Sequence, residues 1–188
     1  MKKLIHAIAI TTVGLLSGGC ASTLSYQDAM DKNRRSLDNM DQVADAQFLV
    51  DAMSFNLLES RLNQLAIEKG YSATVVSHAK KDLERQEDLQ KEIAKLARKE
   101  KMKVPGEMKS EHSSYLNEIE GISRADFDSR FVDLIKRINE ENEEIFEDQA
   151  SKANDADIRA FAARKLDMFK TLDQEITKVD DELMDTRN

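Results

Sequence analysis

Four long stretches of the chain repeat apolar residues at intervals of three and four, which is the spacing of one face of an α-helix. The first stretch begins near Val43, continues to Leu65 and stops at Gly70. We expect Gly70 to take the left-handed conformation that ends many helices. The second stretch runs from about residue 72 to 101. The first half of the chain is therefore predicted to form two long helices joined by a short turn.

The second half of the chain predicts two further long helices after a shorter one. The sequence Val-Pro-Gly at 104–106 breaks the second pattern, and residues 107–121 hold a shorter helical piece. Ser123 is placed to cap a third long helix, and Asn154 or Asp155 to cap a fourth. No segment alternates apolar and polar residues as a half-buried strand would.

Together these elements predict an all-α fold, an antiparallel four-helix bundle with a short connector helix between the second and third long helices. A single long coiled coil is the alternative, but Gly70 and the break at Pro105 favour folding back. The composition agrees with long helices, because 34% of residues are charged, 5% are aromatic and only one is proline.

Three amide residues lie on or near the apolar stripes, where an apolar residue would be expected. They are Gln86, Gln90 and Asn142. A buried polar layer of this kind can fix the register of packed helices. We therefore expect these three residues to be structural rather than catalytic.

The first twenty residues have the pattern of a secretory leader that ends at a cysteine. Lys2 and Lys3 precede an apolar run at 4–16, and small residues lead to Cys20. This pattern resembles a bacterial lipoprotein signal, in which the cysteine is acylated and becomes the new N-terminus. Ser17 departs from the pattern, because leucine is usual three residues before the cysteine.

An ordinary secretory leader cut after Ala21 is the competing interpretation, and it would discard Cys20. Under the lipoprotein interpretation, residues 1–19 are the signal peptide and residues 20–40 are the lipidated cysteine and a polar tether. Residues 41–186 are then the helical-bundle domain.

Localisation and partners follow from the lipid and the charge. Ala21 and Ser22 follow Cys20 without an aspartate, which favours the outer membrane, facing the periplasm. Loss of the leader, with its two lysines, changes the formal net charge from −8 to −10. An acidic domain is not expected to bind nucleic acid or to dock electrostatically on anionic lipid. The expected partners are the membrane, through lipid on Cys20, and a protein of the envelope.

The candidate chemistry of the mature chain is sparse. With Cys20 acylated there is no thiol for catalysis or for metal binding. The Glu-x-x-His pairs that hold iron in di-iron bundles are absent. His112 and Glu59 are the residues to suspect if a metal is bound. We expect no enzyme activity and no cofactor.

Several short pieces, in order along the chain, carry a resemblance to a known family. They are Phe48-Leu49-Val50, Leu58-Glu59, Leu65-Ala66, His112, Phe127-Asp128 and Phe161-Ala162-Ala163-Arg164-Lys165-Leu166. From about residue 48 to 176 the chain resembles the ferritin-like domain-of-unknown-function family 4142 of bacterial envelope proteins. The resemblance implies a ferritin-like helical fold.

The same resemblance marks where this chain departs from the family. The family pattern has histidines in its second, third and fourth long helices, where this chain holds Gln86, Asn139 and Leu172. Only His112 matches. The resemblance therefore implies the fold more firmly than any metal chemistry.

The expected function is that of a lipid-anchored, periplasm-facing helical bundle with a non-catalytic role in interaction or envelope maintenance. Two alternatives belong to other classes. One is a metal- or redox-linked protein that uses His112 and Glu59. The other is a carrier of a small apolar ligand between the helices, oriented by Gln86 and Gln90.

Overall fold

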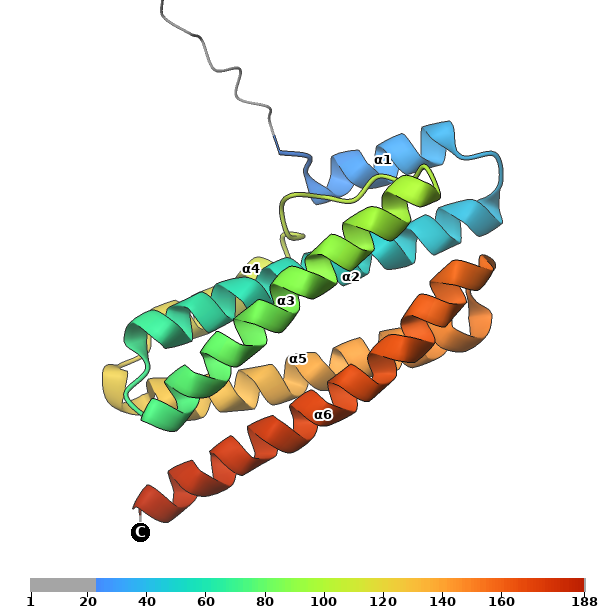
Figure 1. Ribbon diagram of the computed structural model, residues 1–188. Coiled ribbons are helices and arrows are strands. Elements are labelled where there is room, and N and C mark those ends of the chain that lie inside the picture. The colour runs from blue at the N-terminus through green and yellow to red at the C-terminus, as the bar shows by residue number, and fades with distance from the viewer. Residues whose placement is uncertain (1–22, 188) are drawn as a thin grey trace, which may run out of the picture.

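A computed structural model describes residues 23–187 and folds them into six helices, with no strand in that range (Figure 1). The helices are α1 (Tyr26–Ser36), α2 (Met40–Lys69), α3 (Ala73–Lys99), α4 (His112–Glu120), α5 (Arg124–Lys152) and α6 (Ala156–Arg187). The prediction of an all-α fold is confirmed. The expected signal peptide at 1–19 and the acylated Cys20 lie outside the described residues.

The four long helices α2, α3, α5 and α6 form the body of the molecule (Figure 1). Helix α2 packs against α3 and α5, and α6 packs against α5 and α3. Helices α2 and α5 run in opposite directions, because Asp128 near the start of α5 contacts Tyr71 just past the end of α2. Within the described range, none of the helices combines the length and the apolar character needed to cross a bilayer.

The turn between α2 and α3 differs from its prediction. Gly70 has φ −55° and ψ 138°, so it is not left-handed, and the expectation of a left-handed glycine is wrong. The reason for glycine is space. A Cβ at this position would lie 2.5 Å from the carbonyl oxygen of Ala66 and 3.0 Å from Cγ2 of Val76. A side chain there would push the turn away from the end of α2.

The two predicted caps in the second half of the chain behave differently. Asp155 caps α6, because its Oδ1 accepts hydrogen bonds from the backbone N–H groups of Asp157 and Ile158. Ser123 precedes α5 but its hydroxyl donates to the Asp126 carboxylate at 2.7 Å and makes no cap to the backbone. Ser123 therefore occupies the N-cap position of α5 without a side-chain cap.

Helix α1 occupies much of the stretch expected as a tether at 20–40. Its buried face consists of Ala29, Met30 and Asn33, and the two apolar residues form a small cluster with Val50 of α2. A stripe with only two apolar residues is too short to stand out as a helical period. The part of residues 20–40 that forms α1 is therefore packed on the body of the protein.

The apolar core is divided into two clusters along the long helices. One lies toward the Gly70 turn and includes Phe127, Phe131 and Ile176. The other lies toward the opposite end and includes Phe146 and Phe169, whose ring centroids are 4.8 Å apart. Each of the four long helices contributes to both clusters. What separates them is described below.

Replacement of Phe146 tests the second cluster. Phe146 is 1% exposed and its ring also meets Phe48 edge-on at 5.0 Å. We expect Phe146→Ala to lower the free energy of unfolding by about 3–5 kcal/mol, because it leaves a cavity that the neighbours cannot fill. Tyr71, which is 80% exposed, is the control, and Tyr71→Ala should change stability by less than about 0.5 kcal/mol. Urea denaturation measures both, and equal losses would contradict the assignment.

Candidate functional site

A layer of buried polar side chains lies between the two apolar clusters along α3 and α5 and reaches into the first cluster on α2. No member is more than 2% exposed. The members are Asn56, Glu59 and Asn63 on α2, Asp82 and Gln86 on α3, and Asn139 and Asn142 on α5. On each helix they are spaced by three or four residues, so they share one face. We call this set the polar layer.

Glu59 is the centre of the polar layer. Its Oε2 accepts a hydrogen bond from Nε2 of Gln86 at 2.6 Å, and its Oε1 accepts one from Nδ2 of Asn142 at 2.5 Å. Asn56 adds a further link, because its Nδ2 donates to Oε1 of Gln86 at 2.8 Å and to the Gln86 carbonyl at 2.7 Å. One carboxylate thus joins helices α2, α3 and α5.

Asp82 is a second buried carboxylate in the polar layer. Its Oδ2 accepts a hydrogen bond from Nδ2 of Asn63 at 2.7 Å. Burial raises the pKa of Glu59 well above its usual range, and the nearby Asp82 carboxylate raises it further. Burial also raises the pKa of Asp82. Both groups therefore resist being charged at the same time unless positive charge joins them.

The polar layer holds more hydrogen-bond acceptors than donors. Among the described residues, Asn56 Oδ1, Asn63 Oδ1, Asp82 Oδ1 and Asn139 Oδ1 are buried without a donor. The amide nitrogen of Asn139 is the one unmatched donor of the layer. One helical turn before Asp82 on α3, Nε2 of buried His78 also has no partner. Buried oxygens that lack a hydrogen-bond donor are stabilised when a proton, a water molecule or a cation binds them.

His112 lies outside the polar layer, at the start of α4. Its Nδ1 is 3.0 Å from Oγ of Ser54, which also accepts a hydrogen bond from the Lys109 backbone N–H. Its ring centroid is 4.3 Å from that of Phe55. Burial, followed by the charge of Lys109, lowers the pKa of His112 to about 4. The imidazole is therefore neutral at pH 7.

The structure brings together some of the predicted site residues and leaves others apart. Gln86 and Asn142 both contact Glu59 in the polar layer. Gln90 is exposed, so its expected place in the buried layer is wrong. The buried face of α3 continues from Gln86 to Leu89, a step of three, which leaves Gln90 outside. His112 and Glu59 have different polar contacts and form no common site.

Sequence reasoning left four members out of the expected layer. Asp82 lies four residues before Gln86 on the same stripe, and Asn139 lies three before Asn142. Asn56 lies three residues before Glu59, and Asn63 lies four after it. In each case the helical spacing from a recognised residue is the signal that could have found them.

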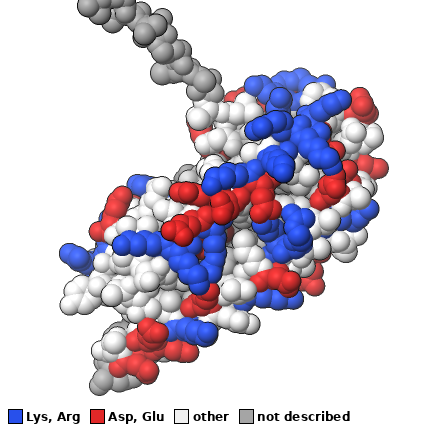
Figure 2. All heavy atoms as spheres, viewed as in Figure 1, with Lys and Arg blue, Asp and Glu red and all other residues white. Residues whose placement is uncertain are grey.

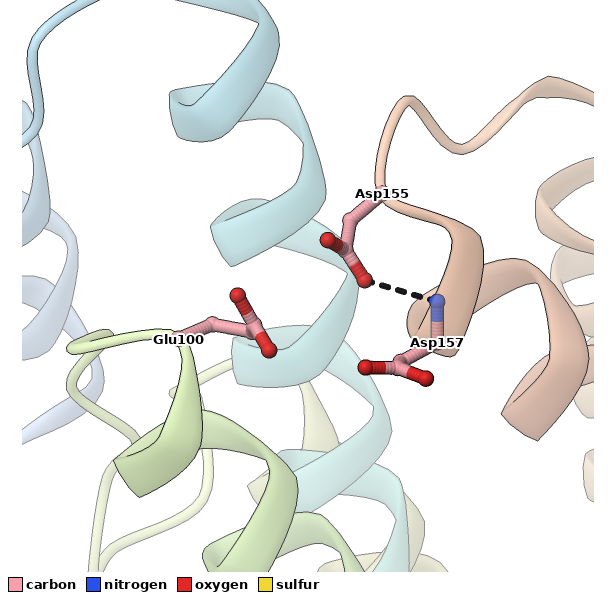
Figure 3. A group of neighbouring side chains, drawn as sticks. All are labelled: Glu100, Asp155 and Asp157. Carbon is pink, nitrogen blue, oxygen red and sulfur yellow. Dashed lines mark hydrogen bonds between the residues drawn. The ribbon is translucent and has the colours of Figure 1, made fainter.

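A second acidic group lies at the opposite end of the molecule from the Gly70 turn (Figure 3). Glu100, Asp155 and Asp157 bring one carboxylate oxygen each within 4.8 Å of one another. The Lys99 ammonium contacts Asp157 and lies 3.3 Å from Glu100. Asp155 is engaged as the cap of α6. The protein's own lysine and backbone thus satisfy this group, and it supports no cation site.

A hollow of about 720 Å³ opens near the Gly70 turn, between the start of α5 and the end of α6. Its lining includes Tyr71, Ala125 and Leu183. Gln86 and Gln90 do not line it. The hollow therefore differs from the ligand site between the helices that those two residues were expected to orient.

The depressed pKa of His112 predicts how stability depends on pH. His112 takes up a proton near pH 6.5 in the unfolded chain but only near pH 4 in the folded chain. As the pH is lowered from about 6.5 to about 4, the free energy of unfolding should therefore fall by up to roughly 3 kcal/mol. The raised pKa values of Glu59 and Asp82 act in the opposite direction. Urea denaturation of wild type and His112→Gln across this range isolates the histidine, and parallel curves would refute the assignment.

Comparison with known proteins places the chain in a family. No curated protein and no solved structure matches it. Residues 31–179, most of the chain and all of the polar layer, match the family described as Domain of unknown function (DUF4142). The chain belongs to the DUF4142 family.

Proposed function

We propose that this protein is a bacterial lipoprotein, acylated at Cys20, that presents a helical domain to the periplasm from the outer membrane. Its role is non-catalytic binding of a protein partner or maintenance of the envelope. The leader pattern that ends at Cys20 supports export and acylation.

The contacts of Thr23 and Leu24 with the loop at 106–107 are the observation that carries this proposal. Thr23 donates a hydrogen bond from Oγ1 to Oε1 of Glu107 at 2.9 Å, and the Gly106 N–H donates to the Leu24 carbonyl at 2.8 Å. Thr23, three residues after Cys20 in the sequence, is therefore already in contact with the folded domain. Three residues span at most about 10 Å, so a lipid on Cys20 would hold the domain close to the bilayer.

The helix packing supports an antiparallel four-helix bundle of the ferritin-like type. Helices α2, α3, α6 and α5 each contact the next, which closes a ring. The chain passes from α3 to α5 through a long connection that contains α4, the position expected for a connector. In this arrangement the polar layer sets the register of α2, α3 and α5. Shifting one helix along its neighbours would leave its buried amides without hydrogen-bond partners.

Acylation is tested in growing cells with a palmitate label. We expect the wild-type protein to incorporate the label and to fractionate with the outer membrane. Cys20→Ser should incorporate none, because it lacks the sulfur that is acylated. Cleavage after Ala21 would instead give a soluble, unlabelled protein. The mass of the mature N-terminal peptide decides between the two processing routes.

A second candidate function is binding of a hard divalent cation in the polar layer. The excess of buried oxygens favours it, because carboxylate and amide oxygens are the ligands of Ca²⁺, Mg²⁺ and Mn²⁺. The buried oxygens free to bind a cation belong to Asn56, Asn63, Asp82 and Asn139. A cation there would also offset the repulsion between the two buried carboxylates, which otherwise favours their neutral forms.

Thermal unfolding after chelation tests this candidate. Addition of the binding cation at 100 times its Kd should stabilise the fold by about 2.7 kcal/mol and raise Tm by roughly 5–10 °C. Asp82→Asn should abolish the shift and still fold, because burial already disfavours the Asp82 charge. Asp157→Asn, in the lysine-paired group, is the matched control and should keep it. If none of the three cations raises Tm, the layer is structural only.

A further inference from the structure

Positive charge gathers at one end of this acidic protein (Figure 2). Six exposed cations form what we call the basic end: Lys32, Arg34, Arg35, Arg98, Lys101 and Lys103. The segments 31–35 and 98–103 together hold seven lysines and arginines against two carboxylates, a net charge of +5, although the whole chain carries −8. Charge on this protein is therefore segregated.

Few of these cations have a carboxylate partner. Arg34 lies 3.7 Å from Asp31. Among the described residues, the other five make no ion pair. Lys99, which is not part of the basic end, is the cation that pairs with Glu100 and Asp157. The basic end is thus left available to an external anion.

A buried asparagine holds the two basic segments together. Asn33 is fully buried, its Nδ2 donates to the Lys103 carbonyl at 2.8 Å, and its Oδ1 accepts from the Lys103 N–H at 2.7 Å. This clamp fixes α1 against the loop after α3, which is distant in sequence. Bringing like charges together costs free energy unless an anion compensates.

Lys101, just past the end of α3, has a left-handed backbone conformation. Lys101 has φ 58°, in the left-handed region where glycine is favoured. The Met102 N–H donates to the Ala97 carbonyl at 2.8 Å, which completes the helix end. A lysine here is less favourable for folding than a glycine would be. The carbonyls at the helix ends account for Arg98 of α3 and for Arg34 and Arg35 of α1, but they do not explain Lys32, Lys101 and Lys103.

The basic end also contains a hollow of about 470 Å³. Arg98, Lys101 and Lys103 supply its cations, and its other lining residues are Ala94, Ala97, Met102 and Val104. A hollow with cationic and apolar walls suits an amphipathic anion, a phosphate group that continues into hydrocarbon. That is the chemistry of an anionic phospholipid.

Residues Thr23 and Leu24, close in sequence to Cys20, contact the loop that follows Lys101 and Lys103. Gly106, three residues after Lys103, binds the Leu24 carbonyl, and Cys20 lies four residues before Leu24. Glu107, which follows Gly106, accepts a hydrogen bond from Thr23. The loop after α3 therefore contacts both Leu24, four residues after Cys20 in the sequence, and Asn33 between the cations of α1.

We propose that the basic end binds the anionic headgroups of the leaflet that carries the Cys20 lipid, so that this end of the domain lies against the bilayer. The inference rests on the proposed lipid anchor. Net negative charge argues against docking on anionic lipid, but a surface senses charge only within about 10 Å at ordinary ionic strength. Within that distance of the membrane, the charge of the basic end outweighs the net negative charge of the rest of the protein.

Lysine footprinting of the mature protein tests this proposal. The mass of the purified protein first shows whether Cys20 carries lipid. The protein is then inserted into vesicles of phosphatidylcholine, with or without phosphatidylglycerol. Its lysines are acetylated, and the acetylation of each lysine is quantified by mass spectrometry. With phosphatidylglycerol, we expect acetylation of Lys32, Lys101 and Lys103 to slow about fivefold. Lys170 and Lys178, exposed on α6, should not change. High salt should remove the difference.

Two pairs of substitutions separate binding from folding. Lys101→Gly with Lys103→Ser removes two cations of the basic end and should abolish the protection of Lys32, while the glycine raises Tm by relieving the left-handed lysine. Lys170→Ser with Lys178→Ser removes the same charge from α6 and should leave the protection intact. Loss of protection with both pairs would overturn the proposal.

Other outcomes reject the proposal in distinct ways. Equal acetylation in both vesicles rejects it, and equal protection by inorganic phosphate assigns the basic end to free anions. If the slower acetylation of the basic-end lysines disappears when the protein is diluted, the basic end contacts a second copy of the protein instead of lipid. If the mass shows no lipid on Cys20, the proposed anchor fails separately. The chain is then added to preformed vesicles, where the slower acetylation is still expected.

Discussion

The sharing of one buried carboxylate among three helices is the constraint on which the rest of this structure depends. Glu59 is fixed by amides from α3 and α5, and it lies where the two apolar clusters would otherwise meet. An apolar core alone tolerates sliding of one helix along another, because leucine and phenylalanine contacts are not directional. The hydrogen bonds to Glu59 are directional, so they select one alignment of the helices.

Placing carboxyl groups in the core also has an electrostatic cost, because two of them are buried close together. Asp82 shares the layer with Glu59, and burial raises the pKa of both groups. Replacing such a layer with apolar side chains is often neutral or stabilising in other proteins. Its presence here is therefore better explained by specificity of alignment, or by a bound cation, than by stability.

Much of the fold could be predicted from the sequence, because the long helices bury continuous stripes. Positions defined by their neighbours could not. Gly70 is required by the closeness of the Ala66 carbonyl, which no local pattern reveals. Gln90 and Gln86 look equivalent in sequence, yet only Gln86 faces α2. Asp82 resembles any surface aspartate until Asn63 is seen beside it.

The clamp at Asn33 also determines how the molecule responds to tension. A pull on Cys20 acts first on the contacts of Thr23 and Leu24 with the loop at 106–107, and then on α1 through Asn33. Helix α1 contributes no residue to the polar layer. It is held to α2 by the small cluster with Val50 and by the hydrogen bonds of the Tyr26 hydroxyl with Asp51 and Gln47. An anchor on Cys20 would therefore pull on α1 before it pulls on the polar layer that joins α2, α3 and α5.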